Sequence, residues 1–195
     1  SLSGGSGGVS LLRSSIPVSG STQGYAIFSD PETVDVNLLI GGDNTDDSTT
    51  LPIGLIDIAD ARKDCVVFLS PDKTDVVAND NPRESSTCLT NVLEFRNTDL
   101  NKASSYAFLD SGWKYMYDRY NDVYVWTPLC ADTAGIAVRS DEATETWFSP
   151  AGFNRGQVRG VIKLSFNPTL TQRDSLYKDQ VNPVVAFPGE GTCLF

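Results

Sequence analysis

The sequence predicts an α/β fold. It consists of a mixed, largely parallel β-sheet flanked by helices, with a Tyr-rich β-hairpin and a truncated C-terminal α+β piece. Three observations support this fold class. Strand-like and helix-like segments alternate in the first half of the chain. The strand-like segments are apolar throughout, as in strands that are buried on both faces of a parallel sheet. An aromatic segment farther along alternates with polar residues, which is typical of a β-ribbon.

The first half of the chain contains three predicted strands and two predicted helices. Short β-branched and Leu-rich runs that end at Gly, Ser or Pro indicate the strands, and apolar residues at helical spacing indicate the helices. The predicted order is strand, helix, strand, helix and strand, over residues 34–42, 50–63, 65–71, 85–95 and 104–113. This order favours a parallel or mixed sheet with helices on both sides.

The segment WKYMYDRYNDVYVW interrupts this alternation. Its aromatic and β-branched residues alternate with polar ones, and Asn121-Asp122 is a turn signal, so we expect a two-stranded hairpin. Pro128 then opens a predicted helix that runs to Ser140, because proline suits the first turn of a helix. Several small residues in this helix indicate close packing against a neighbour.

The C-terminal part of the chain contains one more helix and three extended runs. A strand is expected at residues 160–166. Thr171 and Asp174 have the spacing of a capping box, which predicts a helix over residues 173–181. Two short extended runs on either side of a glycine turn, within residues 181–195, end the chain.

Composition divides the chain into three expected parts. Residues 1–24 form a Ser/Gly-rich connection, residues 25–146 the α/β core domain, and residues 147–195 the start of an incomplete C-terminal domain. The chain opens abruptly with SLSGGSGG, without a starting Met or a signal-like segment, so we interpret it as part of a longer protein. No apolar run approaches the roughly 20 residues that a membrane span needs.

Charge and composition disfavour several functional classes. Asp and Glu number 25 against 15 Lys and Arg, for a net charge of −10, and the basic residues are scattered, which argues against direct nucleic-acid binding. Histidine, the commonest general base and metal ligand, is absent. The four cysteines lie in or beside apolar runs without a C-x-x-C pair, which favours buried free thiols in a reducing compartment. A disulfide or a reactive cysteine remains the alternative.

The segment WFSPAGFNRGQVRG, residues 147–160, carries three glycines and two arginines and invites comparison with a phosphate-binding loop. It matches neither G-x-x-x-x-G-K-[ST] nor G-x-G-x-x-G, and it precedes a predicted strand instead of following one. We therefore expect a structural loop. Trp147 and Phe148 would anchor it in the core, Pro150 and the glycines would shape its turns, and Arg155 would bind backbone carbonyls or a carboxylate.

The remaining candidates for chemistry have ordinary structural explanations. The acidic run at residues 43–47 lacks the spacing of a calcium-binding loop. Asp57, Asp60 and Asp64 share one helical face, as solvated acidic residues commonly do. Ser149 lacks a nucleophile elbow and a histidine, and the tyrosines of the ribbon are expected to pack across strands. We therefore assign no catalytic, metal-binding or cofactor-binding residue, and expect no cofactor.

Several segments together resemble the contractile tail sheath proteins of T-even-like myophages. The most specific is WFSPAGFNRG followed by GVIKLSF and by the pairs Leu-Tyr and Asn-Pro within TQRDSLYKDQVNPVVAFPGEGTCLF. Further matches are VDVNLLIGG, ARKDCVVFLSP, KYMYDRYND and WTPLCADTAG, and even the LSGG near the start is similar. The resemblance covers essentially the whole chain, whereas the family's N-terminal segment, outer domains and C-terminal domain are not matched.

The resemblance implies a structural virion protein and no enzyme. It implies a subunit of the sheath that surrounds the tail tube and contracts to drive the tube through the host envelope, with other sheath subunits and the tube as partners. It further implies a location in the phage tail, after assembly in the host cytoplasm, and no contact with nucleic acid or membrane. Lacking the family's exchanged end strands, the chain itself is expected to be monomeric. The alternatives are a sheath from a related contractile injection system and, in a different class, an α/β phosphate- or sugar-binding enzyme domain.

The residues that we expect to be important have structural roles. The loop at 147–156 lies where the α/β body meets the C-terminal piece, so it is expected to fix their relative orientation, and the Asn-Pro pair belongs to the same family pattern. The structural motif therefore comprises Trp147, Pro150, Ala151, Gly152, Asn154, Arg155, Gly156, Asn182 and Pro183.

Overall fold

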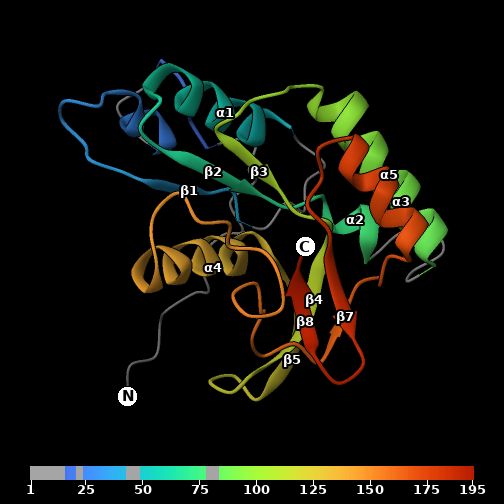
Figure 1. The fold of residues 1–195 in the computed structure, drawn as a ribbon. Coiled ribbons are helices and arrows are strands. Elements are labelled where there is room, and N and C mark those ends of the chain that lie inside the picture. Colours follow the sequence, from blue (N-terminus) through green and yellow to red (C-terminus); the bar gives the residue numbers. More distant parts are fainter. Residues whose placement is uncertain (1–15, 21–23, 43–48, 78–83) are drawn as a thin grey trace, which may run out of the picture.

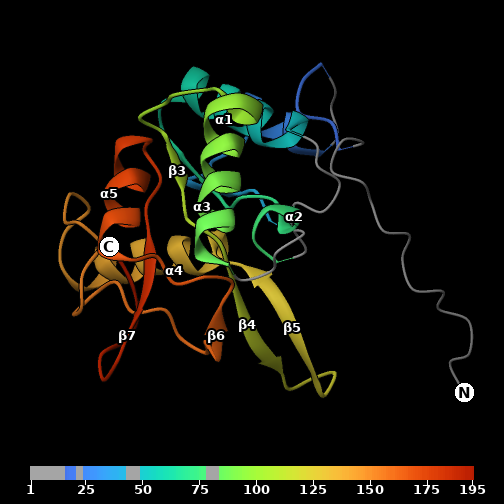
Figure 2. The same cartoon turned by 90° about the vertical axis from the view of Figure 1, so that its right-hand side faces the viewer.

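The structure is a computed structural model that describes residues 16–20, 24–42, 49–77 and 84–195. The helical elements are η2 (Gly24–Ser29), α1 (Thr50–Arg62), α2 (Lys73–Val76), α3 (Ser85–Glu94), η3 (Phe95–Leu100), α4 (Cys130–Ala143) and α5 (Leu170–Lys178). The strands are β1 (Leu38–Ile40), β2 (Val66–Leu69), β3 (Ala107–Leu109), β4 (Trp113–Asp118), β5 (Val123–Pro128), β6 (Lys163–Leu164), β7 (Val184–Phe187) and β8 (Gly191–Leu194). Figures 1 and 2 show how these elements are arranged.

The first three strands form a parallel sheet in the order β1-β2-β3. The register pairs Leu38 with Val66, and Phe68 with Phe108. Figure 1 shows α1 on one side of this sheet and α4 on the other. The alternation of strands and helices, the parallel pairing and the helices on both faces are confirmed.

Alternate side chains of β2 pack against opposite helices, because successive residues of a strand point to opposite faces. Val67 and Leu69 belong to the main hydrophobic cluster together with Leu55 of α1. Phe68 belongs to a second cluster with Cys130 and Ala134 of α4. Both faces of the sheet are therefore buried, which explains why its strands are apolar throughout.

Helix α1 ends where its last residues bind the segment before β1. Lys63 has the left-handed conformation (φ 63°), and its N–H donates to the carbonyl of Ala59 at 2.8 Å, which closes the helix. The guanidinium of Arg62 donates to the carbonyls of Phe28 and Val34, at 2.8 and 3.0 Å. This arginine therefore holds the segment between η2 and β1 against the helix.

The remaining described strands are antiparallel and lie outside this sheet, so the expected mixed sheet is divided into one parallel sheet and two antiparallel ones. Strands β4 and β5 pair in an antiparallel hairpin, β6 pairs with β4, and β7 pairs with β8. The described residues thus hold three small sheets. The turns between β4 and β5 and between β7 and β8 are too short for the crossover that parallel pairing needs.

Two predicted helix starts are shifted. Pro128 is the last residue of β5, and α4 begins at Cys130. The capping box of α5 is formed by Thr169 and Gln172, two residues before the predicted pair. Both pairs have the required spacing, but Thr169 forms the cap, with its hydroxyl accepting from the Gln172 N–H, and Pro168 disfavours a helical conformation at Asn167 before it.

Other differences concern the lengths of elements. The predicted loop after β2 contains the short helix α2, and α3 continues into the π-helical η3. The strand expected at 160–166 is reduced to β6, and the strand expected at 104–113 is divided between β3 and β4. The acidic run at 43–47 and most of residues 1–24 lie outside the described residues. The domain boundaries at 24/25 and 146/147 stay predictions.

All four cysteines, Cys65, Cys88, Cys130 and Cys193, are buried free thiols, as predicted from their apolar surroundings. Within the described ranges, no helix has the length and hydropathy that a membrane crossing requires.

Candidate functional site

The carboxyl edge of the parallel sheet is the place where open α/β sheets usually bind ligands. In this protein it is filled by side chains of the chain itself. Asp110 follows β3 directly and is 0% exposed. Its carboxyl accepts hydrogen bonds from the Ser70 hydroxyl at 2.7 Å and from the Gly112 N–H at 3.0 Å. The Ser70 oxygen in turn accepts from the N–H of Cys130 at 2.9 Å, so β2, β3 and α4 meet at one buried carboxyl group.

Burial is the largest influence on this carboxyl group. It raises the pKa of Asp110 well above the usual value for aspartate, and the nearby charge of Asp132 raises it further. The hydrogen bonds from Ser70 and Gly112 act in the opposite direction, because they favour the charged form. Sequence reasoning missed this residue. The available signal was a polar Asp-Ser-Gly following a buried strand, beside the Ser-Pro-Asp that follows β2.

We predict a characteristic pH dependence from Asp110. Its raised pKa means that the folded protein holds a proton that the unfolded chain releases near pH 3.8, so this contribution to stability is lost as pH rises above that value. In Asp110→Asn, the free energy of unfolding should therefore fall less between pH 4 and 8 than in the parent chain. Urea denaturation across this range measures the difference. Parallel curves for the two proteins would contradict the prediction.

Trp113 connects the parallel sheet to the hairpin. It is the first residue of β4, it is fully buried in the main cluster, and its indole N–H donates to the carbonyl of Pro71 at 2.9 Å. Its backbone N–H donates to the hydroxyl of Ser165 at 3.1 Å. The residue before it is Gly112, where a Cβ would lie 2.7 Å from that same hydroxyl. The base of the hairpin is therefore built into the core.

Lys114, the next residue of β4 after Trp113, joins three elements. It is 6% exposed, and its ammonium lies 2.7 Å from the carboxylate of Asp132 on α4. The ammonium also donates to the carbonyl of Arg159 at 3.2 Å. A buried lysine with a paired charge and a further hydrogen bond fixes β4, α4 and the loop before β6 relative to one another.

The glycines of the predicted loop bind strand β8. The N–H of Gly152 donates to the carbonyl of Leu194 at 2.9 Å, and the N–H of Leu194 donates to the carbonyl of Gly156 at 2.7 Å. Gly156 itself donates to the carbonyl of Gly152 at 2.7 Å, which closes the turn. The pairing continues with Val158, whose N–H donates to the carbonyl of Thr192 at 2.9 Å. The loop therefore forms part of the edge of the β7–β8 sheet.

The aromatic start of this loop does not anchor it. Trp147 is 76% exposed, so the expectation that it inserts into the core is wrong. It contacts Phe148, which is half-buried, and the Arg155 guanidinium lies 4.4 Å from the centre of the Phe148 ring. The Nε of Arg155 donates to the carbonyl of Ser149 at 3.1 Å, in keeping with the expected bond to a backbone carbonyl. The loop turns back on itself here instead of inserting into the body.

Ala151, Pro150 and Asn154 complete the loop. Ala151 packs against a small hydrophobic cluster, which contains Leu129, Ile136, Val158, Val184 and Leu194. Pro150 is half-buried and Asn154 is exposed. This cluster draws its members from α4, β7, β8 and the loop, and it lies beside the half-buried Phe108 of β3.

The Asn-Pro pair connects the parallel sheet to β7. The backbone and side-chain amides of Asn182 both donate to the carbonyl of Leu109, at 2.8 and 3.0 Å. The Pro183 carbonyl accepts from the N–H of Phe195 at 2.9 Å. One residue farther, the N–H of Val184 donates to the Ser111 hydroxyl at 2.9 Å. The two predicted motifs thus converge on the β7–β8 sheet, although Trp147 and Asn154 are exposed. We call the region where this sheet meets the parallel sheet, the base of the hairpin and the loop the junction.

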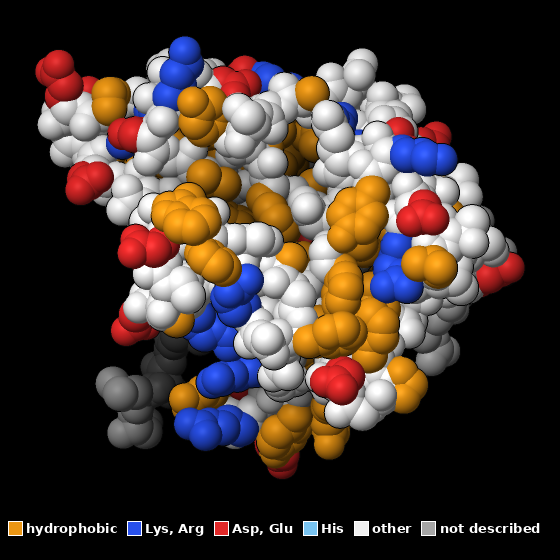
Figure 3. All heavy atoms as spheres, in the orientation of Figure 1, with side chains coloured by type: hydrophobic (Ala, Val, Ile, Leu, Met, Phe, Trp, Pro, Cys, Tyr) orange, Lys and Arg blue, Asp and Glu red, His pale blue; other side chains and the backbone are white. Residues whose placement is uncertain are grey.

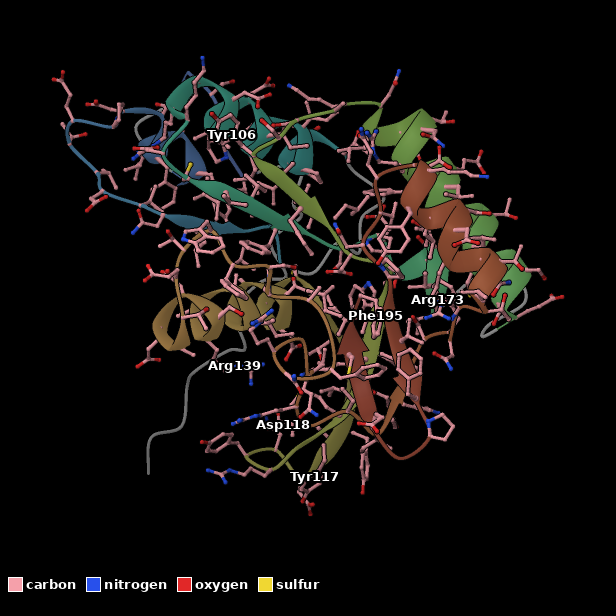
Figure 4. All side chains as sticks on the ribbon, in the orientation of Figure 1. Tyr106, Tyr117, Asp118, Arg139, Arg173 and Phe195 are labelled. Carbon is pink, nitrogen blue, oxygen red and sulfur yellow. The ribbon has the colours of Figure 1, made fainter. Side chains whose placement is uncertain are left out.

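Figure 4 shows the outer end of this junction. Phe195, the residue after β8, lies beside Arg173 of α5. The ring of Phe195 packs edge-on against Phe153, with 5.0 Å between ring centres. It also packs against Phe187 in a tilted arrangement, with 5.1 Å between ring centres. The guanidinium of Arg173 lies 5.5 Å from the centre of the Phe187 ring. Helix α5 is therefore tied to the β7–β8 sheet through aromatic contacts.

The junction contains little that could perform chemistry. In the described part of the chain, no group of three or more carboxylate or cysteine side chains could hold a metal ion. Burial raises the pKa of the Cys130 thiol to about 11, and it also raises the pKa of Cys65 and Cys193. These thiols are therefore protonated at neutral pH and are weak nucleophiles. The contacts described above join the three sheets to one another.

Comparison with known proteins gives consistent matches. Residues 21–194 match the family described as the phage tail sheath protein central domain. The chain is 39% identical over 180 residues to the tail sheath protein of Enterobacteria phage T4, and 36% identical over 188 residues to that of Vibrio phage KVP40. The alignments cover 89% and 88% of this chain, but 27% of each relative, so the chain spans about a quarter of their length.

A solved structure shares the fold. The helical sheath of the anti-feeding prophage (AFP), in its contracted state, matches 87% of this chain and 42% of its own, with a TM-score of 0.55 at 16% identity. Identity this low indicates a common fold and nothing more specific.

Proposed function

The chain belongs to the phage tail sheath protein family through that family's central domain, and we propose that it is the central helix-and-sheet body of a contractile tail sheath subunit. The observation that carries this proposal is the match of residues 21–194, together with 39% identity to the tail sheath protein of phage T4. The role is structural. The subunit would stack with other copies in hexameric rings and a helical array around the tail tube, and contraction would drive the tube through the host envelope.

The junction suits such a subunit. A sheath subunit that moves as a rigid body can exchange one packing arrangement for another without unfolding, as subunits do in rigid-body transitions. Asp110, Trp113, Lys114 and Asn182 bind the parallel sheet, the hairpin and the β7–β8 sheet to one another through buried groups. We propose that this junction fixes the orientation of the C-terminal strands relative to the body.

Electron microscopy of the full-length protein tests the function. We expect purified full-length subunits to polymerise into striated tubes of sheath diameter, whereas this 21.1 kDa chain alone should remain monomeric in light scattering. The subunit would be found in the phage tail, after assembly in the host cytoplasm. Full-length protein that stays monomeric under all polymerising conditions would contradict the proposal, and a stable six-membered ring of this chain alone would contradict its expected monomeric state.

A different-class alternative is an α/β domain that binds phosphates or sugars. The filled carboxyl edge of the sheet argues against it, because the usual ligand position is occupied by Asp110 and its hydrogen-bond partners. A thermal-shift screen with nucleotides and sugar phosphates separates the two classes. A saturable stabilisation by any of them would favour the enzyme domain, and its absence supports the structural role.

A further inference from the structure

A hollow between α4 and the segment before β6 is lined by arginines. Its volume is about 310 Å³, and its wall contains Arg139, Ser140, Asn154, Arg155, Gln157 and Arg159. A neighbouring hollow of about 240 Å³ shares Arg139, Gln157 and Arg159 with it. Figure 3 shows Lys and Arg side chains gathered on this face below α4, and Figure 4 shows Arg139 in the same region. We call the two together the arginine hollow.

Among the described residues, no carboxylate forms an ion pair with the three arginines of the hollow. The ion pairs among the described residues are elsewhere, at Arg62, Lys102 and Lys114. Arg139 donates to the backbone carbonyl of Gln157 at 2.7 Å, and Arg155 donates to that of Ser149. Both keep further N–H groups for other partners, since a guanidinium has five.

The one carboxylate in the wall does not cancel these charges. Asp132 lies in the neighbouring hollow, but its oxygen is 2.7 Å from the ammonium of Lys114. The arginine hollow is therefore positively charged within a chain whose net charge is −10. The sequence places Arg155 and Arg159 in one loop, but Arg139 joins them only through the packing of α4 against that loop.

One residue of the wall, Ser140, is almost fully buried. It is 3% exposed, and its Oγ has no hydrogen-bond partner among the described residues. Because the Oγ atom itself is buried, the guanidinium groups are the donors that the hollow presents to an occupant.

The chemistry of the wall selects an anion with several oxygens. Planar guanidinium groups bind carboxylates through paired hydrogen bonds, and a site that is partly shielded from water strengthens them. The volume suits one or two acidic side chains. The carboxyl edge of the sheet plays no part in this site.

We propose that the arginine hollow binds acidic side chains of a second copy of the protein in the assembled sheath. This inference rests on the proposed function. Over these 195 residues each copy has a net charge of −10, so a second copy offers acidic side chains that are complementary to a cationic hollow. In rings and helices, each contact joins two different patches of neighbouring subunits, and the hollow and an acidic surface would form such a pair.

Peptide titration tests the hollow in this chain. We expect hexaglutamate to bind at low salt, and Arg139→Gln/Arg159→Gln to weaken its binding about tenfold. The control, Arg96→Gln/Arg119→Gln, removes the same charge at sites outside the hollow and should bind as the parent does. Calorimetry measures both affinities. Equal affinities for the two double variants, or absent binding, would overturn the proposal, as would binding of inorganic phosphate without binding of hexaglutamate.

Assembly of the full-length protein tests the identity of the occupant. Full-length Arg139→Gln/Arg159→Gln should form at least about tenfold fewer tubes than the control double variant at equal protein concentration. Tube formation equal to the control would show that the hollow does not receive a second copy. If even the unchanged full-length protein forms no tubes while this chain binds hexaglutamate, the proposed function and the second copy both fail and only the carboxylate site stands.

Discussion

Gly156→Ala should unfold far more easily than the parent chain. A Cβ on this buried glycine would lie 2.7 Å from the carbonyl oxygen of Leu194 and 2.9 Å from the backbone of Gly152. All of these are backbone atoms, so relief requires the loop to move away from β8 and break the hydrogen bonds on both sides. We expect a loss of about 3 kcal/mol, as for severe overpacking, which corresponds to about 6–12 °C in melting temperature.

Gly135→Ala is the matched control for this substitution. Gly135 is an exposed residue of α4, and a Cβ there meets no atom within 4 Å. Because alanine favours a helix more than glycine does, the control should gain about 0.5–1 kcal/mol. Both variants are measured by thermal and urea denaturation. A Gly156→Ala chain as stable as the parent would show that the contact between the loop and β8 is loose.

Trp113→Ala should lower stability by about 3–5 kcal/mol, which is the usual cost of removing a large buried aromatic side chain. Trp113 is fully buried, and its indole N–H is bonded to the carbonyl of Pro71. The loss therefore combines a cavity with an unpaired carbonyl group. Trp113→Phe fills much of the cavity and should cost less, so it keeps the prediction testable if the alanine variant does not fold.

Trp147→Ala removes an exposed tryptophan and is therefore the contrast to Trp113→Ala, which removes a buried one. Trp147 is 76% exposed and contacts mainly Phe148. Its removal should change the free energy of unfolding by at most about 0.5 kcal/mol. Urea denaturation followed by circular dichroism compares the two variants without relying on tryptophan fluorescence. Equal losses at the two positions would contradict the assignment of Trp113 to the core and of Trp147 to the surface.

Much of the parallel sheet could be predicted from the sequence. Its strands are apolar on both faces, and Val67 and Phe68 illustrate why, since they contact opposite helices. The antiparallel sheets were harder to predict. The pairing of β6 with β4 covers two residues and depends on contacts distant in sequence, which no local pattern contains.

The junction was predicted only in part. Turn-forming residues and a known family pattern predicted the structural importance of Gly152, Gly156 and Asn182. Trp147 was misplaced because a large aromatic residue is usually buried, whereas here it lies in an exposed turn. Asp110 and Lys114 were missed, because charged residues are seldom buried and only the tertiary partners Ser70 and Asp132 make them so.

We expect the junction to make the parallel sheet and the β7–β8 sheet one cooperative body. Native-state hydrogen exchange tests it at single amides. The N–H groups of Asn182, Val184 and Leu194 should exchange with the same free energy of opening as that of Val67 in the parallel sheet. If the amides of the β7–β8 sheet open at markedly lower free energy while Val67 stays protected, the two sheets unfold as separate units and the junction does not join them.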